Sequence, residues 1–143
     1  IMIPHEQTFE AIGSDALLRR VGELKAGGWR LAAISAAKNA AGLELIYTFD
    51  REYRLLNLRL QLAGEVVKVP SVSAQFFCAA LYENELHDLF GLEVENMALD
   101  FKGNLYRTAV KFPFGCTKAP APALAASSEA AKSPAVAAAN KGA

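Results

Sequence analysis

The segment "LNLRLQL" (residues 56–62) has the most regular hydrophobic pattern in this chain of 143 residues. Leucine occupies every second position, and Asn57, Arg59 and Gln61 fill the positions between. Because successive side chains of a strand point to opposite faces, this alternation predicts a strand with one apolar and one polar face. We therefore expect helices to cover only the apolar face of the sheet.

Further extended segments lie close to this strand in the chain. We predict strands over residues 29–38 and 43–50, joined by a turn at residues 39–42. A hairpin turn at residues 63–64 should lead into another strand over residues 65–70. Connections this short cannot contain crossover helices, so these strands should pair antiparallel.

Helical periodicity appears twice. Residues 8–25 carry an apolar stripe, and the glycines at 27–28 provide the stop signal. A second helical region is predicted from an N-cap at Ser73 to a stop at Gly91. Cys78 lies in the apolar part of that region, where a free thiol is expected to pack as a small core residue.

The fold class predicted from these patterns is α+β: an antiparallel sheet with helices packed on one face. Residues 98–114 should add further extended structure with a turn near Gly103. We expect one folded domain over residues 1–116. Residues 117–143 are rich in Ala, Pro and Ser and contain no aromatic residue, so we expect a disordered or loosely docked tail.

The overall composition argues against several classes of function. Lys and Arg balance Asp and Glu at 15 each, and the basic residues do not cluster with aromatic ones, so no nucleic-acid partner is expected. No apolar run approaches the ~20 residues of a membrane span, and no secretory signal is apparent at the N-terminus. Two cysteines without Cys-x-x-Cys spacing favour a reduced, cytoplasmic compartment.

The stretch "ENELHDLFGLEV" (residues 83–94) contains the candidate chemistry. Glu83 and His87 have the helical spacing of two metal ligands, which suggests a freestanding metal-dependent enzyme that uses Glu83, His87 and Asp88. Two ligands on one helix do not complete a site, however, and Glu83 and Glu85 should face different directions. We therefore expect no catalytic residue and no metal or cofactor site in this chain.

The same stretch combines carboxylates with large apolar residues such as Phe90. This mixture suits an interface in which acids meet cations of a partner and aromatic residues anchor the centre. Alternatively, the apolar residues fold back onto the sheet while the acids cap the turn. Composition leaves both interpretations open.

Residues 83–92 resemble a signature of the 30 kDa subunit of the proton-pumping NADH–quinone oxidoreductases (complex I). That signature is Glu-Arg-Glu, two residues, then Asp-Leu-Phe-Gly-Ile, and Asn84 stands here in place of its Arg. A looser resemblance covers most of residues 8–112. It implies the α+β fold of the complex I 30 kDa subunit.

After the signature, this chain lacks the Gly-His-Pro stretch and the long basic, proline-rich segment of the complex I proteins. The shortened form, with "ENELHDLFG" and "GNLYR", is similar to the small hydrophilic subunit of membrane-bound energy-converting NiFe hydrogenases of the Ech or CO-induced type. The resemblance implies a non-catalytic subunit that braces the hydrogenase large subunit and the iron–sulfur subunits. Those partners would carry the Ni-Fe and iron–sulfur clusters and move electrons from ferredoxin to protons.

By the same resemblance, the chain would be peripheral to the inner, cytoplasmic face of the cell membrane and would reach it only through its partners. The alternative is the 30 kDa subunit of a complex I-like NADH (or other donor)–quinone oxidoreductase. In either complex the signature is expected to supply these interface and framework groups: Glu83, Glu85, His87, Asp88, Phe90 and Gly91. We also expect Arg107 to pair with one of the acids inside the domain. Because buried acids without partners are costly, the isolated subunit is expected to be less stable or to aggregate.

Overall fold

The computed structural model of the chain describes residues 6–64 and 67–115. It confirms the α+β class. Within the described ranges, no helix is long and apolar enough to cross a membrane. In chain order the elements are β1 (Glu6–Ala11), α1 (Ser14–Ala26), β2 (Arg30–Asn39), β3 (Gly42–Arg51), β4 (Arg54–Leu62), β5 (Lys68–Pro70), α2 (Ala79–Phe90) and β6 (Glu93–Glu95).

The main sheet has the strand order β1-β4-β3-β2, and β2, β3 and β4 form the antiparallel meander that the sequence predicts. Glu52 and Tyr53 form the two-residue loop between β3 and β4, and both have positive φ angles. Such a loop matches the right-handed twist of paired strands. Among the strands that the structure describes, β2 pairs with β3 alone and forms one edge of the sheet.

Strand β1 corrects the prediction of a helix over residues 8–25. Residues 6–11 pair in parallel with β4, from Glu6 opposite Arg54 to Ala11 opposite Arg59, so the sheet is mixed. Helix α1 begins only at Ser14. The edge of β4 would otherwise leave its backbone hydrogen-bonding groups unpaired, and β1 satisfies them. The partner strand lies about 50 residues further along the chain, so the local sequence pattern could not predict this pairing.

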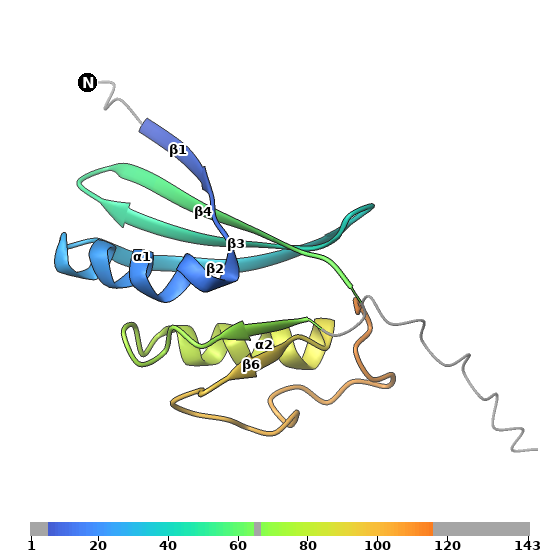
Figure 1. Cartoon of the computed structure of the whole chain (residues 1–143). Helices are drawn as coiled ribbons and strands as arrows, with labels where there is room; N and C mark the ends of the chain where they lie inside the picture. Colours follow the sequence, from blue (N-terminus) through green and yellow to red (C-terminus); the bar gives the residue numbers. More distant parts are fainter. Residues whose placement is uncertain (1–5, 65–66, 116–143) are drawn as a thin grey trace, which may run out of the picture.

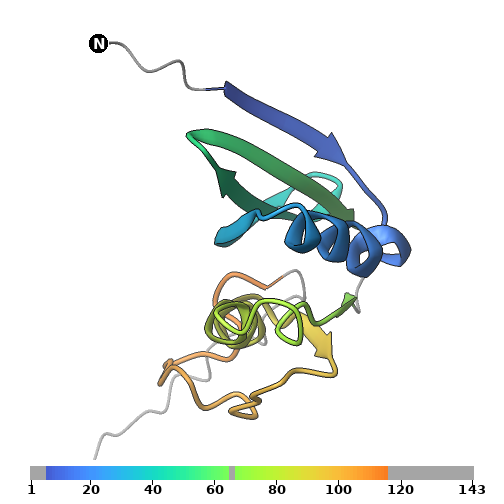
Figure 2. The ribbon, with the colours of Figure 1, turned by 90° about the vertical axis from the view of Figure 1, so that its left-hand side faces the viewer.

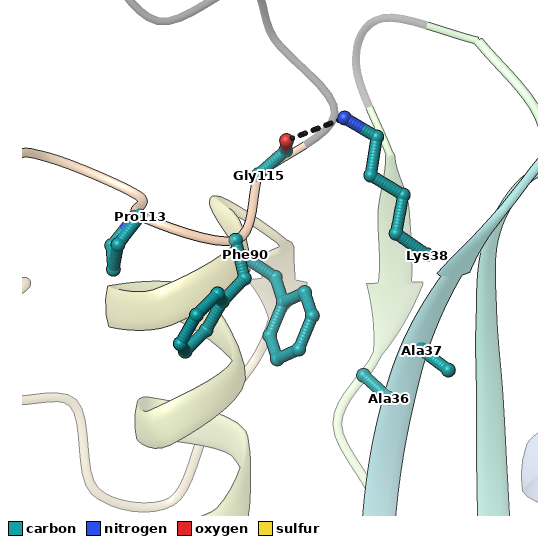
Figure 3. Close-up of a pocket in the computed structure, with 7 residues that line it drawn as sticks. Ala36, Ala37, Lys38, Phe90, Pro113 and Gly115 are labelled. Carbon is teal, nitrogen blue, oxygen red and sulfur yellow. Dashed lines mark hydrogen bonds between the residues drawn. The ribbon is translucent and has the colours of Figure 1, made fainter.

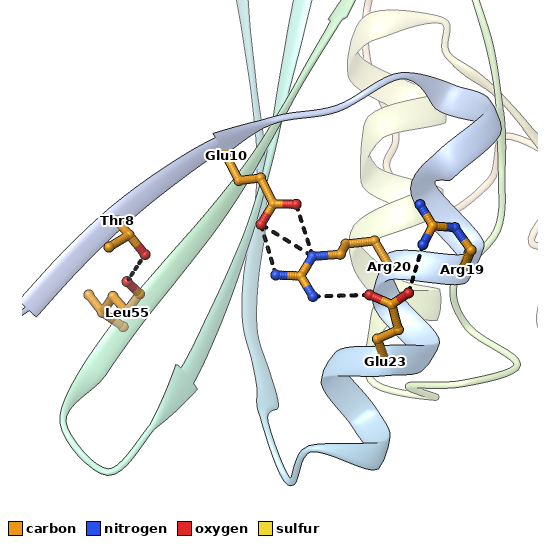
Figure 4. Close-up of polar contacts among 6 residues, drawn as sticks. All are labelled: Thr8, Glu10, Arg19, Arg20, Glu23 and Leu55. Carbon is orange, nitrogen blue, oxygen red and sulfur yellow. Dashed lines mark hydrogen bonds and ion pairs between the residues drawn. The ribbon is translucent and has the colours of Figure 1, made fainter.

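An arginine fastens α1 to β1. The Arg20 guanidinium donates hydrogen bonds to both Glu10 oxygens at 2.8–3.2 Å and a further one to Glu23 at 3.1 Å (Figure 4). The hydrogen bond to Glu10 is the main cause that raises the pKa of Arg20. The Glu10–Arg20 pair thus links α1 to β1, a strand whose residues 8–11 were predicted to be part of the helix.

The core lies on one face of the sheet, as predicted. Both helices and the small second sheet lie on that side (Figures 1 and 2). The alternation along β3 and β4 directs every second side chain into the core, where they meet the apolar stripe of α1. The largest fully buried core residues are Leu17, Val21, Leu43, Leu45, Tyr47, Phe49, Leu58, Leu60, Val69, Val72 and Leu92.

The prediction of a hairpin between β4 and the next strand is wrong. β5 pairs instead with β6, in parallel, to form a separate two-stranded sheet, with Val69 opposite Val94. Both valines are buried on the common core, where β5 also lies against α1. Burial of this apolar pair explains why β5 leaves the main sheet, because pairing with β4 is already taken by β1.

Helix α2 begins later than predicted. Ser73 is not its N-cap: residues 74–78 form turns, and the helix starts at Ala79 after Cys78. The buried Ser73 hydroxyl instead accepts a hydrogen bond from the Ala98 backbone N–H at 2.8 Å. The expected burial of Cys78 is also wrong, because its side chain is exposed. The predicted stop at Gly91 is confirmed, since Gly91 adopts the left-handed conformation with φ +73°.

Between residues 97 and 115, the described chain forms turns and bends rather than the predicted extended structure. This segment, called the C-terminal loop below, runs beside α2 (Figure 1). Side chains of α2 supply hydrogen bonds that strand partners would otherwise provide. The predicted tail at residues 117–143 lies outside the described residues.

Candidate interface on the second helix

The Glu83 carboxylate is turned inward and has an exposed fraction of 1%. It accepts hydrogen bonds from the Ser71 hydroxyl at 2.6 Å and from the Val72 backbone N–H at 2.7 Å. Burial raises the pKa of Glu83, and the hydrogen bonds from Ser71, Val72 and Ser73 oppose that rise. The charge of Glu83 in turn adds to the desolvation that raises the pKa of Tyr47. Glu83 therefore ties α2 to the segment that follows β5.

Asn84 joins the helix to the C-terminal loop. Its side-chain amide donates to the Ala80 carbonyl at 2.7 Å and to the Leu99 carbonyl at 2.8 Å. Its side-chain oxygen accepts from the Phe101 backbone N–H at 2.8 Å. An arginine, as in the complex I signature, has five donors but no acceptor and could not bond the Phe101 N–H. Asn84, which replaces the arginine of the signature, is therefore suited to hold the C-terminal loop in the position that it has in this chain.

His87 and Asp88 contact each other, although neighbouring residues of a helix are expected to point apart. Their Nδ1 and Oδ1 atoms are 3.2 Å apart. The other Asp88 oxygen accepts from the Tyr106 backbone N–H at 2.8 Å. The His87 ring also contacts Phe112 edge-on, with centroids 5.8 Å apart. Asp88 is buried and, like Asn84, holds the C-terminal loop on α2.

Glu85 and Arg107 lie nearer the surface. Glu85 accepts a long hydrogen bond of 3.4 Å from the Tyr106 hydroxyl. Arg107 is exposed, and no ion pair between the described residues involves it. The expected pairing of Arg107 with an acid of the signature is therefore not formed within the described chain.

Phe90 and Gly91 end α2 beside the last described residues. A Cβ added to Gly91 would lie 3.0 Å from Cγ of Phe112, so the glycine is required by close packing as well as by its positive φ. Phe90 packs against Phe114 with centroids 5.7 Å apart. The Phe114 backbone N–H donates to the Leu89 carbonyl at 2.9 Å. These contacts close the helix onto the C-terminal loop.

An apolar hollow of about 440 Å³ lies between the end of α2 and strand β2 (Figure 3). Phe90, Phe114 and Ala36 contribute its apolar surface. At its rim, Lys38 donates a hydrogen bond to the Gly115 carbonyl at 3.1 Å. The hollow offers an apolar surface and one cation that already has a partner.

Large apolar side chains are exposed in the turn that precedes α2 and on the helix itself. Phe77 and Leu81 are four residues apart, and their exposed fractions are 69% and 57%. Glu85 follows after another four residues, and the partly exposed Tyr106 bonds to it. We name Phe77, Leu81, Glu85 and Tyr106 the α2 stripe. Exposed apolar residues gathered in this way mark surfaces that contact other proteins.

The metal-dependent enzyme suggested by the spacing of Glu83 and His87 requires these two side chains to converge. Glu83 is directed to Ser71, whereas His87 is directed to Asp88 and Phe112, so the proposed metal ligands diverge. Among residues 6–64 and 67–115, no three His, Cys, Asp or Glu side chains are grouped to hold a metal ion. Glu83 and Asp88 instead accept hydrogen bonds from the backbone N–H groups of Val72 and Tyr106. Sequence reasoning missed Ser71 and Phe77 because their roles depend on where α2 begins.

Comparison with known proteins identifies the fold and the family of this chain. No curated protein sequence is significantly similar to the chain. The structure of a trypsin-resistant fragment of Nqo5 is similar, with a TM-score of 0.59 and 18% identity over 65% of this chain and 82% of that one. A chain of the membrane-bound sulfane sulfur reductase, an archaeal respiratory membrane complex, has a TM-score of 0.66 and 14% identity over 80% of this chain and 73% of that one. The family profile of the respiratory-chain NADH dehydrogenase 30 kDa subunit matches residues 12–106. This chain therefore belongs to the family of the 30 kDa subunit of respiratory-chain NADH dehydrogenase.

Proposed function

We propose that this chain is a non-catalytic assembly subunit of a membrane-bound energy-converting NiFe hydrogenase complex. It braces the large subunit and the iron–sulfur subunits that carry electrons from ferredoxin to protons. The observation that carries this proposal is the α2 stripe, in which Phe77 and Leu81 are largely exposed beside a rigid framework of hydrogen-bonded acids. A partner that covers the stripe would remove apolar surface from water, which favours association.

The inward direction of Glu83 and Asp88 supports a bracing role. Both carboxylates are buried and serve to order backbone segments, so they hold the surface in shape and do not reach a substrate. A surface that is rigid before binding loses less conformational freedom on association. Metal clusters belong, in this proposal, to the partner subunits.

The assignment to a hydrogenase rests on the residues after the signature. They lack the Gly-His-Pro stretch of the complex I proteins and form the compact C-terminal loop on α2. The second candidate is the 30 kDa subunit of a complex I-like NADH–quinone oxidoreductase, which the family profile and the spacing of the signature favour.

Purification from native membranes tests the proposal. The full chain, tagged and expressed in its own host, should be recovered with a large subunit, iron–sulfur subunits and stoichiometric nickel. The preparation should evolve hydrogen from reduced ferredoxin. Recovery with a flavin-containing NADH module and quinone reductase activity would establish the second candidate instead. Recovery of the chain alone, with its own metal and turnover, would overturn both and favour a freestanding enzyme that uses Glu83, His87 and Asp88.

The proposal also places the chain at the inner face of the cell membrane, attached through its partners. High salt or alkaline carbonate should release it together with the other peripheral subunits. Retention of the chain on membranes that have lost those subunits would contradict attachment through partners.

A further inference from the structure

A second pocket, of about 230 Å³, lies between the C-terminal turn of α2 and the C-terminal loop. His87 and Asp88 form its wall on the helix side. Lys102, Thr108 and Lys111 are among the residues that line it from the loop. It is separate from the apolar hollow beside Phe90, with which it shares no lining residue.

The charges around this pocket are unbalanced. Lys102 and Lys111 form no ion pair with any acid of the described residues. Asp88 is the one acid among the described lining residues, and both of its oxygens already have partners, His87 Nδ1 and the Tyr106 backbone N–H. Two ammonium groups against one carboxylate leave one excess positive charge, which suits a singly charged anion.

The pocket is also shaped in advance. Lys102 and Phe112 both have positive φ angles, 54° and 52°, which residues other than glycine seldom adopt. Gly103, with φ +76°, brings the loop so close that an added Cβ would lie 3.3 Å from Cε1 of His87. Unfavourable backbone conformations of this kind collect at functional sites, where the surrounding structure enforces them.

We propose that this pocket receives the carboxylate of an Asp or Glu side chain from the subunit that covers the α2 stripe. Lys102 and Lys111 pair with the carboxylate, Thr108 is placed to donate a hydrogen bond, and the Phe112 ring packs beside the methylene groups of the incoming side chain. The volume suits one side chain and the charge suits one carboxylate. The inference rests on the proposed function, and it adds the chemistry by which the partner is recognised.

Zero-length cross-linking of the complex purified from native membranes tests this directly. A carbodiimide joins an amine to a carboxylate that it contacts, so peptides containing Lys102 or Lys111 should be found linked to an acidic residue of a co-purifying subunit. An intact complex that gives inter-subunit cross-links at other lysines, but none at these two, would overturn the inference and leave the proposed function standing. Recovery of the chain without partners would overturn both.

Charge reversal gives an independent measurement. Lys102→Glu and Lys111→Glu, each in the full chain, should lower recovery of the partner subunits by about tenfold or more, because a like charge then faces the carboxylate. Arg54→Glu is the matched control, since it makes the same change of charge at an exposed site on β4 and should change recovery less than about twofold. Equal recovery for all three variants would contradict the inference. Saturable binding of inorganic phosphate by the isolated chain, with NMR shifts confined to His87, Thr108 and Lys111, together with unchanged partner recovery for both lysine variants, would identify a small-anion site instead and overturn the docking role.

Discussion

The Glu83 carboxylate accepts a hydrogen bond of 2.6 Å from the Ser71 hydroxyl, and both side chains are buried. The pair joins the first turns of α2 to the segment after β5. Because the carboxylate has lost its water, burial raises the pKa of Glu83, and the surrounding donors only partly oppose this. The acid is thus both the main polar link between these elements and a source of pH-dependent stability.

We expect Glu83→Gln to fold and to be at least as stable as the parent chain at pH 7. The amide can accept from the Val72 N–H and donate to Ser71. For an acid whose pKa is raised by folding, the unfolded state ionises first as pH rises. The parent chain should therefore lose stability relative to Glu83→Gln from about pH 4.5, the ordinary pKa, up to the raised pKa, and the difference should then stay constant.

Urea unfolding of both chains between pH 4 and 8 measures this difference. Glu52→Gln, which removes an exposed carboxylate from the β3–β4 loop, is the control for the loss of one negative charge. Glu83→Ala should lose about 2–4 kcal/mol at any of these pH values because Ser71 and Val72 are left unpaired. A Glu83→Gln chain that is less stable than the parent at pH 7 would mean that the ionised carboxylate is preferred in the folded state.

The hydrogen bonds of Asn84 predict a local effect on the C-terminal loop. Asn84→Ala should lower the free energy of unfolding by about 2–3 kcal/mol, because it removes the partners of three backbone groups in buried or partly buried hydrogen bonds. Amide exchange at Phe101 should also become faster in the folded protein. Glu85→Ala is the matched control on the same helix, with one long contact, and should cost less than about 0.5 kcal/mol. Unchanged exchange at Phe101 would show that the loop is held by other contacts.

Alanine substitutions at Gly91 and Gly28 distinguish the cost of a strained backbone from the cost of close packing. Both have positive φ, +73° and +78°, but a Cβ at Gly28 would meet nothing within 4 Å whereas one at Gly91 would meet the Phe112 ring. Gly28→Ala should therefore cost only the conformational term, about 1–2 kcal/mol. Gly91→Ala should cost at least about 1 kcal/mol more, because the Phe112 ring must move.

Denaturant unfolding gives both values, and a double variant tests their cause. Adding Phe112→Ala to Gly91→Ala should recover most of the extra cost if the clash with the ring is its source. Equal losses of stability for Gly91→Ala and Gly28→Ala would show that the Phe112 ring moves freely. Close packing would then not be a reason for the glycine at position 91.

How much of the fold can be predicted from the sequence depends on how local each pattern is. The alternation at residues 56–62 is set by a strand that buries one face, so three strands, their antiparallel pairing and the single covered face could be predicted. Residues 8–11 fit the helical spacing of the residues that follow, but their conformation is decided by the open edge of β4. The predicted start of α2 is too early because the Ser73 hydroxyl does not cap the helix. It accepts a hydrogen bond from the backbone N–H of Ala98, 25 residues away.

The candidate site shows the same limit. The spacing of Glu83, Asp88 and Gly91 identifies a signature and its family, yet spacing does not reveal which acids are buried. Tertiary contacts decide that, through Ser71 for Glu83 and Tyr106 for Asp88. The exposure of Phe77 and Cys78 likewise follows from the turns at residues 74–78, which turn an apolar stretch away from the core.

The exposed position of Phe77 leads to the last prediction. Phe77→Ser should leave the free energy of unfolding within about 0.5 kcal/mol of the parent, because the ring contributes little to the core. It should nevertheless lower recovery of partner subunits from membranes and reduce self-association of the isolated chain, measured by light scattering. Tyr53→Ser is the matched control: Tyr53 is exposed to 67%, against 69% for Phe77, but lies in the β3–β4 loop away from α2. If the two variants lower recovery equally, the effect is one of general surface hydrophobicity. If neither does, partners dock elsewhere on the chain and the α2 stripe has no part in assembly.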